Sequence, residues 1–282
     1  MSRIAIVTDS TAYIPKELVE KYEIYVAPAI SIWGEESYLD GIDIQPGEFY
    51  ERLKTAKVMP TTSQATVAHV HKIFEPLVAE GRPILVIVIS DLLSGTLQSA
   101  SQAKEMLPDA TIRLVNSRTT SMELGFQVLA AARAAEVGKP FEEVVQVAEE
   151  AKNHTGIYFV VDTLEYLHRG GRIGGAQRFI GTAISMKPLL TVTDGRIESF
   201  ESVRTKKKAF ARLLEVIEQE TAGKPNVRLA SLHAAAEDDA KYLLEEASKR
   251  TNPVETIVSE VSPAVGTHVG PGTVGLAYST DL

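Results

Sequence analysis

The feature that most constrains the fold is an uninterrupted run of six apolar residues, Ile84–Ile89, with a helical pattern on each side. Six residues suit a strand buried on both faces and fall far short of the roughly 20 apolar residues that cross a bilayer. Shorter β-branched runs at 4–7 and 111–115 also alternate with helical stretches. This alternation predicts a parallel sheet covered by helices on both faces.

The second half of the chain follows a different pattern. Two predicted strands, 189–193 and 196–200, flank Asp194-Gly195, a dipeptide typical of tight β-hairpins. A further strand at 227–233 lies between two predicted helices. This half is therefore expected to be α+β with a mixed sheet.

The 282 residues have room for two domains, at about 150 residues per domain. We predict an α/β protein with a boundary near 153–156. The N-terminal parallel-sheet α/β domain would span 1–154 and the C-terminal α+β domain 155–282, with the ligand between them.

Composition excludes several function classes. The 29 Lys and Arg against 37 Asp and Glu give a net charge of −8, which argues against nucleic-acid binding and broad adhesion to anionic membranes. The absence of cysteine excludes disulfides, thiolate nucleophiles and Cys-ligated metals, and fits a reducing cytosol. The first residues do not form a signal peptide, because their apolar run is too short. We therefore expect a cytoplasmic protein.

The first polar cluster, residues 60–64, precedes a helix predicted at 64–79. Thr62 or Ser63 would serve as the N-cap of that helix. The alternative is that the hydroxyls and free helix amides bind an anion.

The second cluster, residues 90–96, follows the most apolar strand and opens a helix. It contains Ser94 and Gly95, and Gly95 lets a ligand approach the backbone closely. The cluster is either a capped turn or a binding loop, because ligands of open α/β sheets lie beyond the carboxyl ends of strands. Neither cluster matches a phosphate-binding P-loop or a Gly-x-Ser-x-Gly nucleophile elbow.

The third cluster, residues 266–272, is expected to be a rigid glycine-rich loop that holds His268. The sequence has no His-Glu-x-x-His motif and no calcium loop, so we expect no metal and no other cofactor. Hydroxyls, helix amides and one histidine suit a carboxylate headgroup, which accepts several hydrogen bonds.

The sequence resembles the DegV family, bacterial fatty-acid-binding proteins that serve a fatty acid kinase. The resemblance runs along the whole chain. Its motifs are Thr8-Asp9-Ser10-Thr11, Leu39-Asp40-Gly41-Ile42-Asp43, Thr62-Ser63-Gln64, Leu93-Ser94-Gly95-Thr96, the segment from Leu164 to Ile173, Lys187-Pro188-Leu189 and the segment from Gly266 to Gly272.

The resemblance implies that one palmitate-like, long-chain fatty acid is buried in a tunnel between the two domains. Thr62 and Ser94 would hydrogen-bond its carboxylate, with His268 close by. The expected near neighbours of these residues are Thr61, Ser63 and Gly95.

The resemblance also implies a non-enzymatic carrier, with no catalytic residues of its own. A partner fatty acid kinase would phosphorylate the bound acid to an acyl phosphate for phospholipid synthesis. Arg172 and Arg204 match family positions suited to the headgroup or the kinase interface. Contact with a membrane would be transient, during loading.

Two other function classes remain open at this point. A serine-dependent acyl hydrolase would use Ser94 or His268, although no acid that would orient the base is apparent. A regulatory module that senses a small metabolite would share the fold and have a short, wet pocket.

Overall fold

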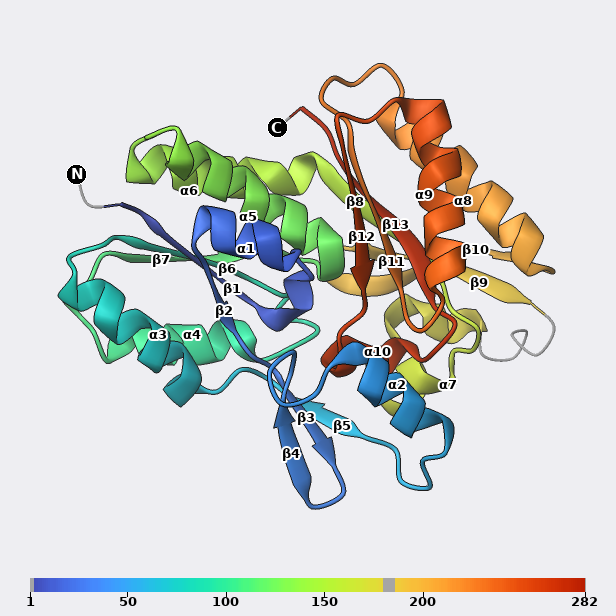
Figure 1. The fold of residues 1–282 in the computed structure, drawn as a ribbon, viewed down its shortest axis with the longest axis horizontal. Coiled ribbons are helices and arrows are strands. Elements are labelled where there is room, and N and C mark those ends of the chain that lie inside the picture. The colour runs from blue at the N-terminus through green and yellow to red at the C-terminus, as the bar shows by residue number, and fades with distance from the viewer. Residues whose placement is uncertain (1–2, 180–185, 282) are drawn as a thin grey trace.

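The computed structural model describes residues 3–179 and 186–281, and its first sheet is the predicted parallel one (Figure 1). The strand order is β2-β1-β6-β7, and every neighbouring pair is parallel. The four strands are β1 (Ala5–Asp9), β2 (Ile24–Ala27), β6 (Ile84–Val88) and β7 (Ile112–Asn116).

Helices cover both faces of this sheet, as the apolar run predicts. Figure 1 shows α3 and α4 on one side, and α1, α5 and α6 on the other. In β6, Val86 packs with the core around α3 and α4, whereas Leu85 and Ile87 pack with the core that contains α5. The helices are α1 (Lys16–Tyr22), α3 (Val67–Ala79), α4 (Thr96–Glu105), α5 (Ser121–Glu136) and α6 (Phe141–Glu150).

A small antiparallel sheet, β4-β3-β5, projects from the first half of the chain. The sequence pattern at 26–32 predicts a single strand, and this prediction is wrong, because two strands, β2 and β3, share these residues. The chain leaves the parallel sheet before Pro28, which has no N–H for a ladder hydrogen bond, and enters this second sheet. The elements here are β3 (Ile30–Trp33), β4 (Glu36–Leu39), β5 (Thr61–Ser63) and α2 (Pro46–Lys54).

The second half forms a mixed sheet of six strands in the order β10-β9-β8-β13-β11-β12. Only β11 and β12 are parallel neighbours. The predicted hairpin is confirmed, with Asp194 and Gly195 at φ 52° and 83° between its strands. The strands are β8 (Thr155–Val160), β9 (Lys187–Thr193), β10 (Arg196–Val203), β11 (Arg228–His233), β12 (Glu255–Glu260) and β13 (Val274–Ser279).

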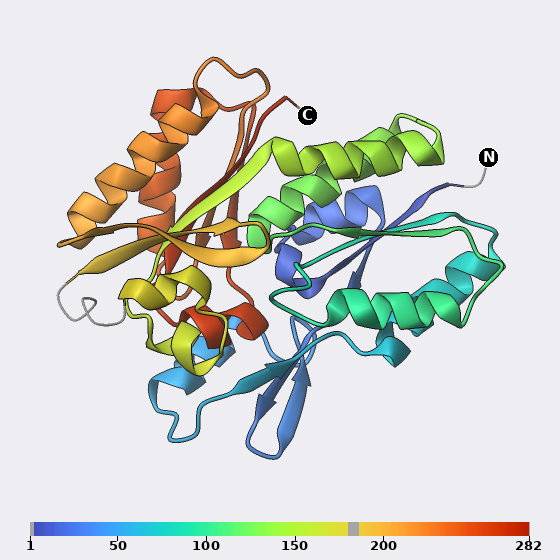
Figure 2. The ribbon, with the colours of Figure 1, turned by 180° about the vertical axis from the view of Figure 1, so that it is seen from behind.

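The two faces of the mixed sheet have different partners. Helices α8 (Lys206–Thr221) and α9 (Glu237–Thr251) cover one face (Figure 2). Side chains of the other face, such as Phe159 and Leu232, join the core that includes Ile6 and Phe126 of the first half. The two large sheets therefore share one continuous core.

Three short helical elements, η1 (Ser10–Ala12), η2 (Ala151–Asn153) and η3 (Gly174–Phe179), connect the strands and longer helices. The short helices α7 (Glu165–Arg169) and α10 (Pro263–Val269) lie beside each other. The expectation of a loop around His268 is wrong, because His268 lies in the last turn of α10. Among residues 3–179 and 186–281, no helix is long and apolar enough to cross a membrane.

Candidate functional site

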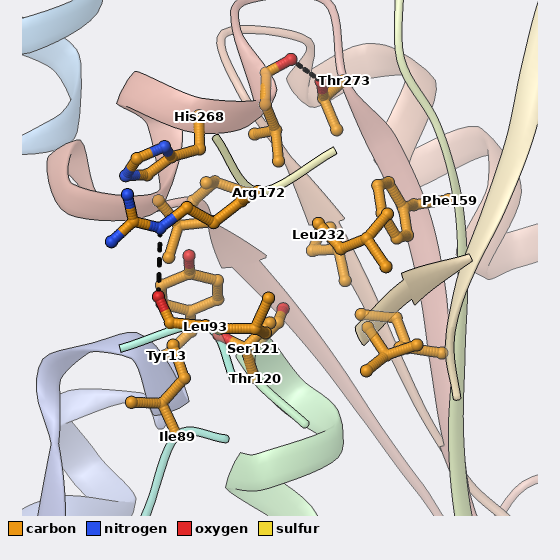
Figure 3. A pocket seen from close by; sticks show the side chains of 16 residues that line it. Tyr13, Ile89, Leu93, Thr120, Ser121, Phe159, Arg172, Leu232, His268 and Thr273 are labelled. Atoms are coloured by element: carbon orange, nitrogen blue, oxygen red, sulfur yellow. Dashed lines mark hydrogen bonds between the residues drawn. The ribbon is translucent and has the colours of Figure 1, made fainter. Parts of the chain in front are cut away.

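An apolar cavity lies beyond the carboxyl ends of the parallel strands (Figure 3). Tyr13, Leu93 and Ser121 line it, and they follow β1, β6 and β7 respectively. Because parallel strands end at the same edge of a sheet, three segments far apart in sequence meet here.

The opposite wall of the cavity comes from the six-stranded sheet and α10, so both halves of the chain enclose it. Its volume is about 70 Å³. Ten of its sixteen lining residues are apolar: Ile89, Leu93, Ile157, Phe159, Val192, Ile197, Leu232, Val261, Val265 and Val269. This lining therefore favours an apolar ligand group, such as a hydrocarbon tail.

A second, more polar pocket of about 250 Å³ adjoins the apolar cavity. Both spaces are lined by Arg172 and His268, which therefore stand between them. Thr61 and Thr62 line the second pocket as well. We refer to Thr62, Arg172 and His268 as the polar gate.

Within the gate, Thr62 Oγ1 and His268 Nε2 share a hydrogen bond of 2.7 Å. Burial, helped by the nearby Arg172 guanidinium, lowers the pKa of His268 to about 4. The imidazole is therefore neutral at physiological pH and offers hydrogen bonds rather than charge. Its Nδ1 is buried and has no hydrogen-bond partner among the described residues.

Arg172 supplies the positive charge of the gate. Its Nε donates to the Leu93 carbonyl at 3.1 Å, and its Nη1 donates to the Gly170 carbonyl at 2.7 Å. Both partners are neutral carbonyls, so these contacts orient the guanidinium without cancelling its charge. A carboxylate at the mouth of the cavity would gain both this charge and the hydrogen bonds of the gate.

Ser94 and Gly95 lie at the start of α4, next to the segment that follows β5. Ser94 Oγ is 3.0 Å from Thr96 Oγ1. A Cβ on Gly95 would lie 3.1 Å from the Gln64 side chain, which is a tight fit. Ser94 is adjacent in the chain to Leu93, whose carbonyl Arg172 contacts, but neither Ser94 nor Gly95 is among the residues that line the two pockets.

The predicted role of Thr62 or Ser63 as a helix cap is wrong. Residues 61–63 form β5, which pairs with β3, and α3 begins only at Val67. The cap is Thr66, whose Oγ1 accepts from the backbone N–H of His69. Because side chains alternate along a strand, Thr61 and Ser63 lie on the opposite face of β5 from Thr62, although Thr61 still borders the second pocket.

Arg204 lies apart from the polar gate. It is exposed between β10 and α8, and it is not among the residues that line either pocket. The structure therefore brings together Thr62, His268 and Arg172, places Ser94 one residue beyond Leu93 and outside both pocket linings, and leaves Arg204 on the surface.

Asp40 fixes the helix that carries His268. Its carboxylate accepts from the backbone N–H of Ala264 at 3.0 Å and from the Ser10 hydroxyl at 2.6 Å. Burial raises the pKa of Asp40 to about 6. Asp40 thereby links the end of β4 to the first turn of α10.

Sequence reasoning missed Tyr13, Thr120 and Ser121, which line the cavity. A signal was present in residues 117–121, a hydroxyl-rich stretch between a strand and a helix. Residues 90–96 have the same pattern, with hydroxyl side chains between a strand and a helix. Among the described residues, no group of three or more His, Asp or Glu side chains could hold a metal ion.

The comparisons with known proteins all indicate the same family. A family model described as "Uncharacterised protein, DegV family" matches residues 3–281. A DegV domain-containing protein of Clostridium perfringens is 36% identical over 282 residues, covering 99% of each chain.

Solved structures agree with this match. A DegV family protein from Thermus thermophilus, described as fatty-acid binding, aligns with a TM-score of 0.94 and 32% identity, covering 99% of this chain and 100% of that one. A stearic acid-binding protein from Eubacterium ventriosum aligns with a TM-score of 0.90 and 26% identity, covering 98% of each chain.

Proposed function

The chain belongs to the DegV family, and from that premise we propose that it binds one long-chain fatty acid between residues 1–154 and 155–282, taken as two domains. The observation that carries the proposal is the apolar cavity with a polar gate at one end. Relatives of the same fold are described as fatty-acid-binding proteins.

The carboxylate would lie at the gate and the tail in the cavity. Thr62 and Ser94 would donate hydroxyl hydrogen bonds, and Arg172 would supply the charge that a buried carboxylate needs to stay ionised. Because the gate borders the second pocket, where Thr61 and Arg169 are exposed, the carboxylate would remain reachable from outside. Thr61, Ser63 and Gly95 would support this end through the backbone of their segments.

Burial of the tail supplies most of the affinity in this proposal. At about 0.8 kcal/mol per methylene, a palmitate-like tail gains on the order of 10 kcal/mol before ordering costs. A cavity of about 150 Å³ holds benzene, so the 70 Å³ seen here is too small for such a tail. The lining side chains must move apart on binding, and that cost lowers the net affinity.

We further propose that the protein is a carrier rather than an enzyme. A partner fatty acid kinase would transfer the γ-phosphoryl group of ATP to the exposed carboxylate, leaving ADP and an acyl phosphate for phospholipid synthesis. Arg204, on the surface near the basic start of α8, is proposed as a kinase contact. The proposed location is the cytoplasm, with transient membrane contact during loading.

The geometry favours this function over the two alternatives. A hydrolase needs a serine activated by a base, yet His268 pairs with Thr62, and Ser94 contacts Thr96. A sensor of a small polar metabolite needs a wet pocket, whereas the cavity wall is mostly apolar.

Titration with palmitic acid, followed by calorimetry, tests the proposal. We expect saturable binding of one acid per chain, weakened by Thr62→Ala and by Ser94→Ala with little loss of thermal stability. With a fatty acid kinase and ATP, the same variants should yield less acyl phosphate. An unchanged yield in the double variant would refute the assigned roles of Thr62 and Ser94.

A further inference from the structure

Two buried hydroxyls on adjacent residues of the cavity wall have no hydrogen-bond partner among the described residues. Thr120 and Ser121 are 9% and 3% exposed, and both line the cavity. Neither Thr120 Oγ1 nor Ser121 Oγ has a hydrogen-bond partner among the described residues. In Figure 3 both side chains lie across the cavity from Phe159 and Leu232.

Two of the other hydroxyls near the cavity are paired, whereas the Tyr13 hydroxyl, which also lines it, has no hydrogen-bond partner among the described residues. Thr273, which lines the same cavity, donates to the Val269 carbonyl at 2.9 Å. Ser90 donates to the Gly195 carbonyl at 2.8 Å. An unpaired buried hydroxyl costs stability, because it loses its hydrogen bonds to water without replacement. A plain hydrocarbon tail would leave that cost in place at Thr120 and Ser121.

We propose that the cavity is selective for an oxygenated acyl chain, a long-chain fatty acid with a hydroxyl near its middle, which Thr120 and Ser121 recognise by hydrogen bonds. This inference rests on the proposed fatty-acid-binding function and names its substrate class. An alcohol suits the pair because Ser and Thr hydroxyls each both donate and accept.

A ligand with a second carboxylate beside Thr120 and Ser121 would suit the cavity less well than one with a hydroxyl. Glu123 lies in the same first turn of α5, where its carboxyl accepts from the Thr119 hydroxyl at 2.5 Å. Burial raises the pKa of Glu123 to about 8. An anion placed beside this turn would disfavour ionisation of Glu123 further and would itself be desolvated. A neutral hydroxyl carries neither cost.

Backbone contacts connect the segment that carries the two hydroxyls to the gate. The Ser90 N–H donates to the Thr119 carbonyl at 2.8 Å. The Leu93 N–H donates to the Ser90 carbonyl at 3.0 Å, and Leu93 in turn contacts Arg172. One tight turn therefore separates the Thr119–Ser121 segment from the gate, so the two hydroxyls would face the acyl chain between its carboxylate and its far end.

The test compares stearic acid with a hydroxystearic acid that carries its hydroxyl at mid-chain. Dissociation constants are measured for the wild-type protein and for the double variant Thr120→Val with Ser121→Gly. Thr120→Val keeps the side-chain shape, and Ser121→Gly fits the φ of 61° found at this position. Thr120→Val alone serves as a second variant that leaves the backbone unaltered.

We expect the wild-type protein to bind the hydroxylated acid more tightly than stearic acid. The double variant should lower that preference by about tenfold, because the hydroxyl then loses both partners. Thr273→Val is the matched control: its hydroxyl is already paired, so the ratio of the two dissociation constants should not change.

Wild-type binding of the hydroxylated acid that is no tighter than that of stearic acid, or a ratio unaltered in the double variant, would overturn the inference. Binding of stearic acid shows whether the inference alone or the proposed fatty-acid-binding function has failed. If stearic acid binds and the ratio shows no preference, only the inference is wrong. If neither acid binds, the fatty-acid-binding function itself is wrong.

Discussion

The His268 imidazole occupies the space where a side chain at position 170 would begin. Gly170→Ala should therefore displace His268 and perturb the polar gate directly. A Cβ at position 170 would lie 2.0 Å from His268 Nδ1 and 2.9 Å from Cε1. The Gly170 backbone, with φ −75° and ψ −7°, accepts alanine without strain. The imidazole must therefore move, by about 1 Å or more, to restore ordinary van der Waals contact.

The displacement breaks the 2.7 Å hydrogen bond between Thr62 Oγ1 and His268 Nε2. This hydrogen bond is partly buried, and its loss, which leaves one partner unpaired, costs about 1–3 kcal/mol. If the gate holds the carboxylate, the dissociation constant for palmitic acid should rise roughly 5- to 150-fold, since about 1.4 kcal/mol is tenfold. Calorimetric titration measures the affinity, and ¹⁵N NMR of the His268 ring reports the broken bond.

Gly47→Ala is the matched control. Gly47 lies in α2, and a Cβ there would meet nothing within 4 Å. Its affinity for palmitic acid should equal that of the wild type. If Gly170→Ala also binds palmitic acid like the wild type, with His268 resonances unchanged, the reasoning about the gate is refuted.

Three further predictions concern buried titratable groups. Burial raises the pKa of Glu123 from its ordinary value of 4.5 to about 8 in the folded protein. The free energy of unfolding should therefore fall as the pH rises from about 4.5 to 8, by at most about 1.4 kcal/mol per pH unit, because the folded state holds the proton in this range and the unfolded state does not. Urea unfolding should show this slope in the wild type and a flatter profile in Glu123→Gln. A bound carboxylate should raise the pKa of His268 from about 4 towards its ordinary value. Binding at pH 5 should then take up protons, seen as buffer-dependent heats that vanish at pH 8. Asp40→Ala removes the acceptor for the Ala264 N–H, and should lower stability by about 1–3 kcal/mol and weaken palmitic acid binding, because α10 carries His268; unchanged stability and affinity would contradict this role.

Local patterns predicted much of the fold because they act over a few residues. The apolar run of β6 predicts burial on both faces whatever surrounds it, and Asp194-Gly195 predicts a hairpin because both residues tolerate positive φ. Such signals need no knowledge of distant partners. The parallel sheet and the hairpin were therefore accessible from the sequence.

The errors arose where distant contacts decide the local structure. Residues 61–63 look like a helix cap, yet pairing with β3 makes them a strand. The glycines around His268 suggest a loop, yet Pro263 at the first turn and the Asp40 carboxylate support a helix.

The polar gate itself joins Thr62 to His268 across 206 residues of sequence. No local pattern encodes such a contact, and only the family resemblance brought the two residues together before the fold was known. The hydroxyls of Thr120 and Ser121 were missed for a related reason: their position depends on which strands lie side by side in the sheet.

Native mass spectrometry of the purified protein, followed by denaturing extraction and lipid analysis, tests the central claim most directly. The account predicts one long-chain fatty acid per chain, released only on denaturation, with hydroxylated acids enriched over the host's free fatty-acid pool. A protein that is purified without lipid, and that shows no mass shift when palmitic or hydroxystearic acid is added, would contradict it.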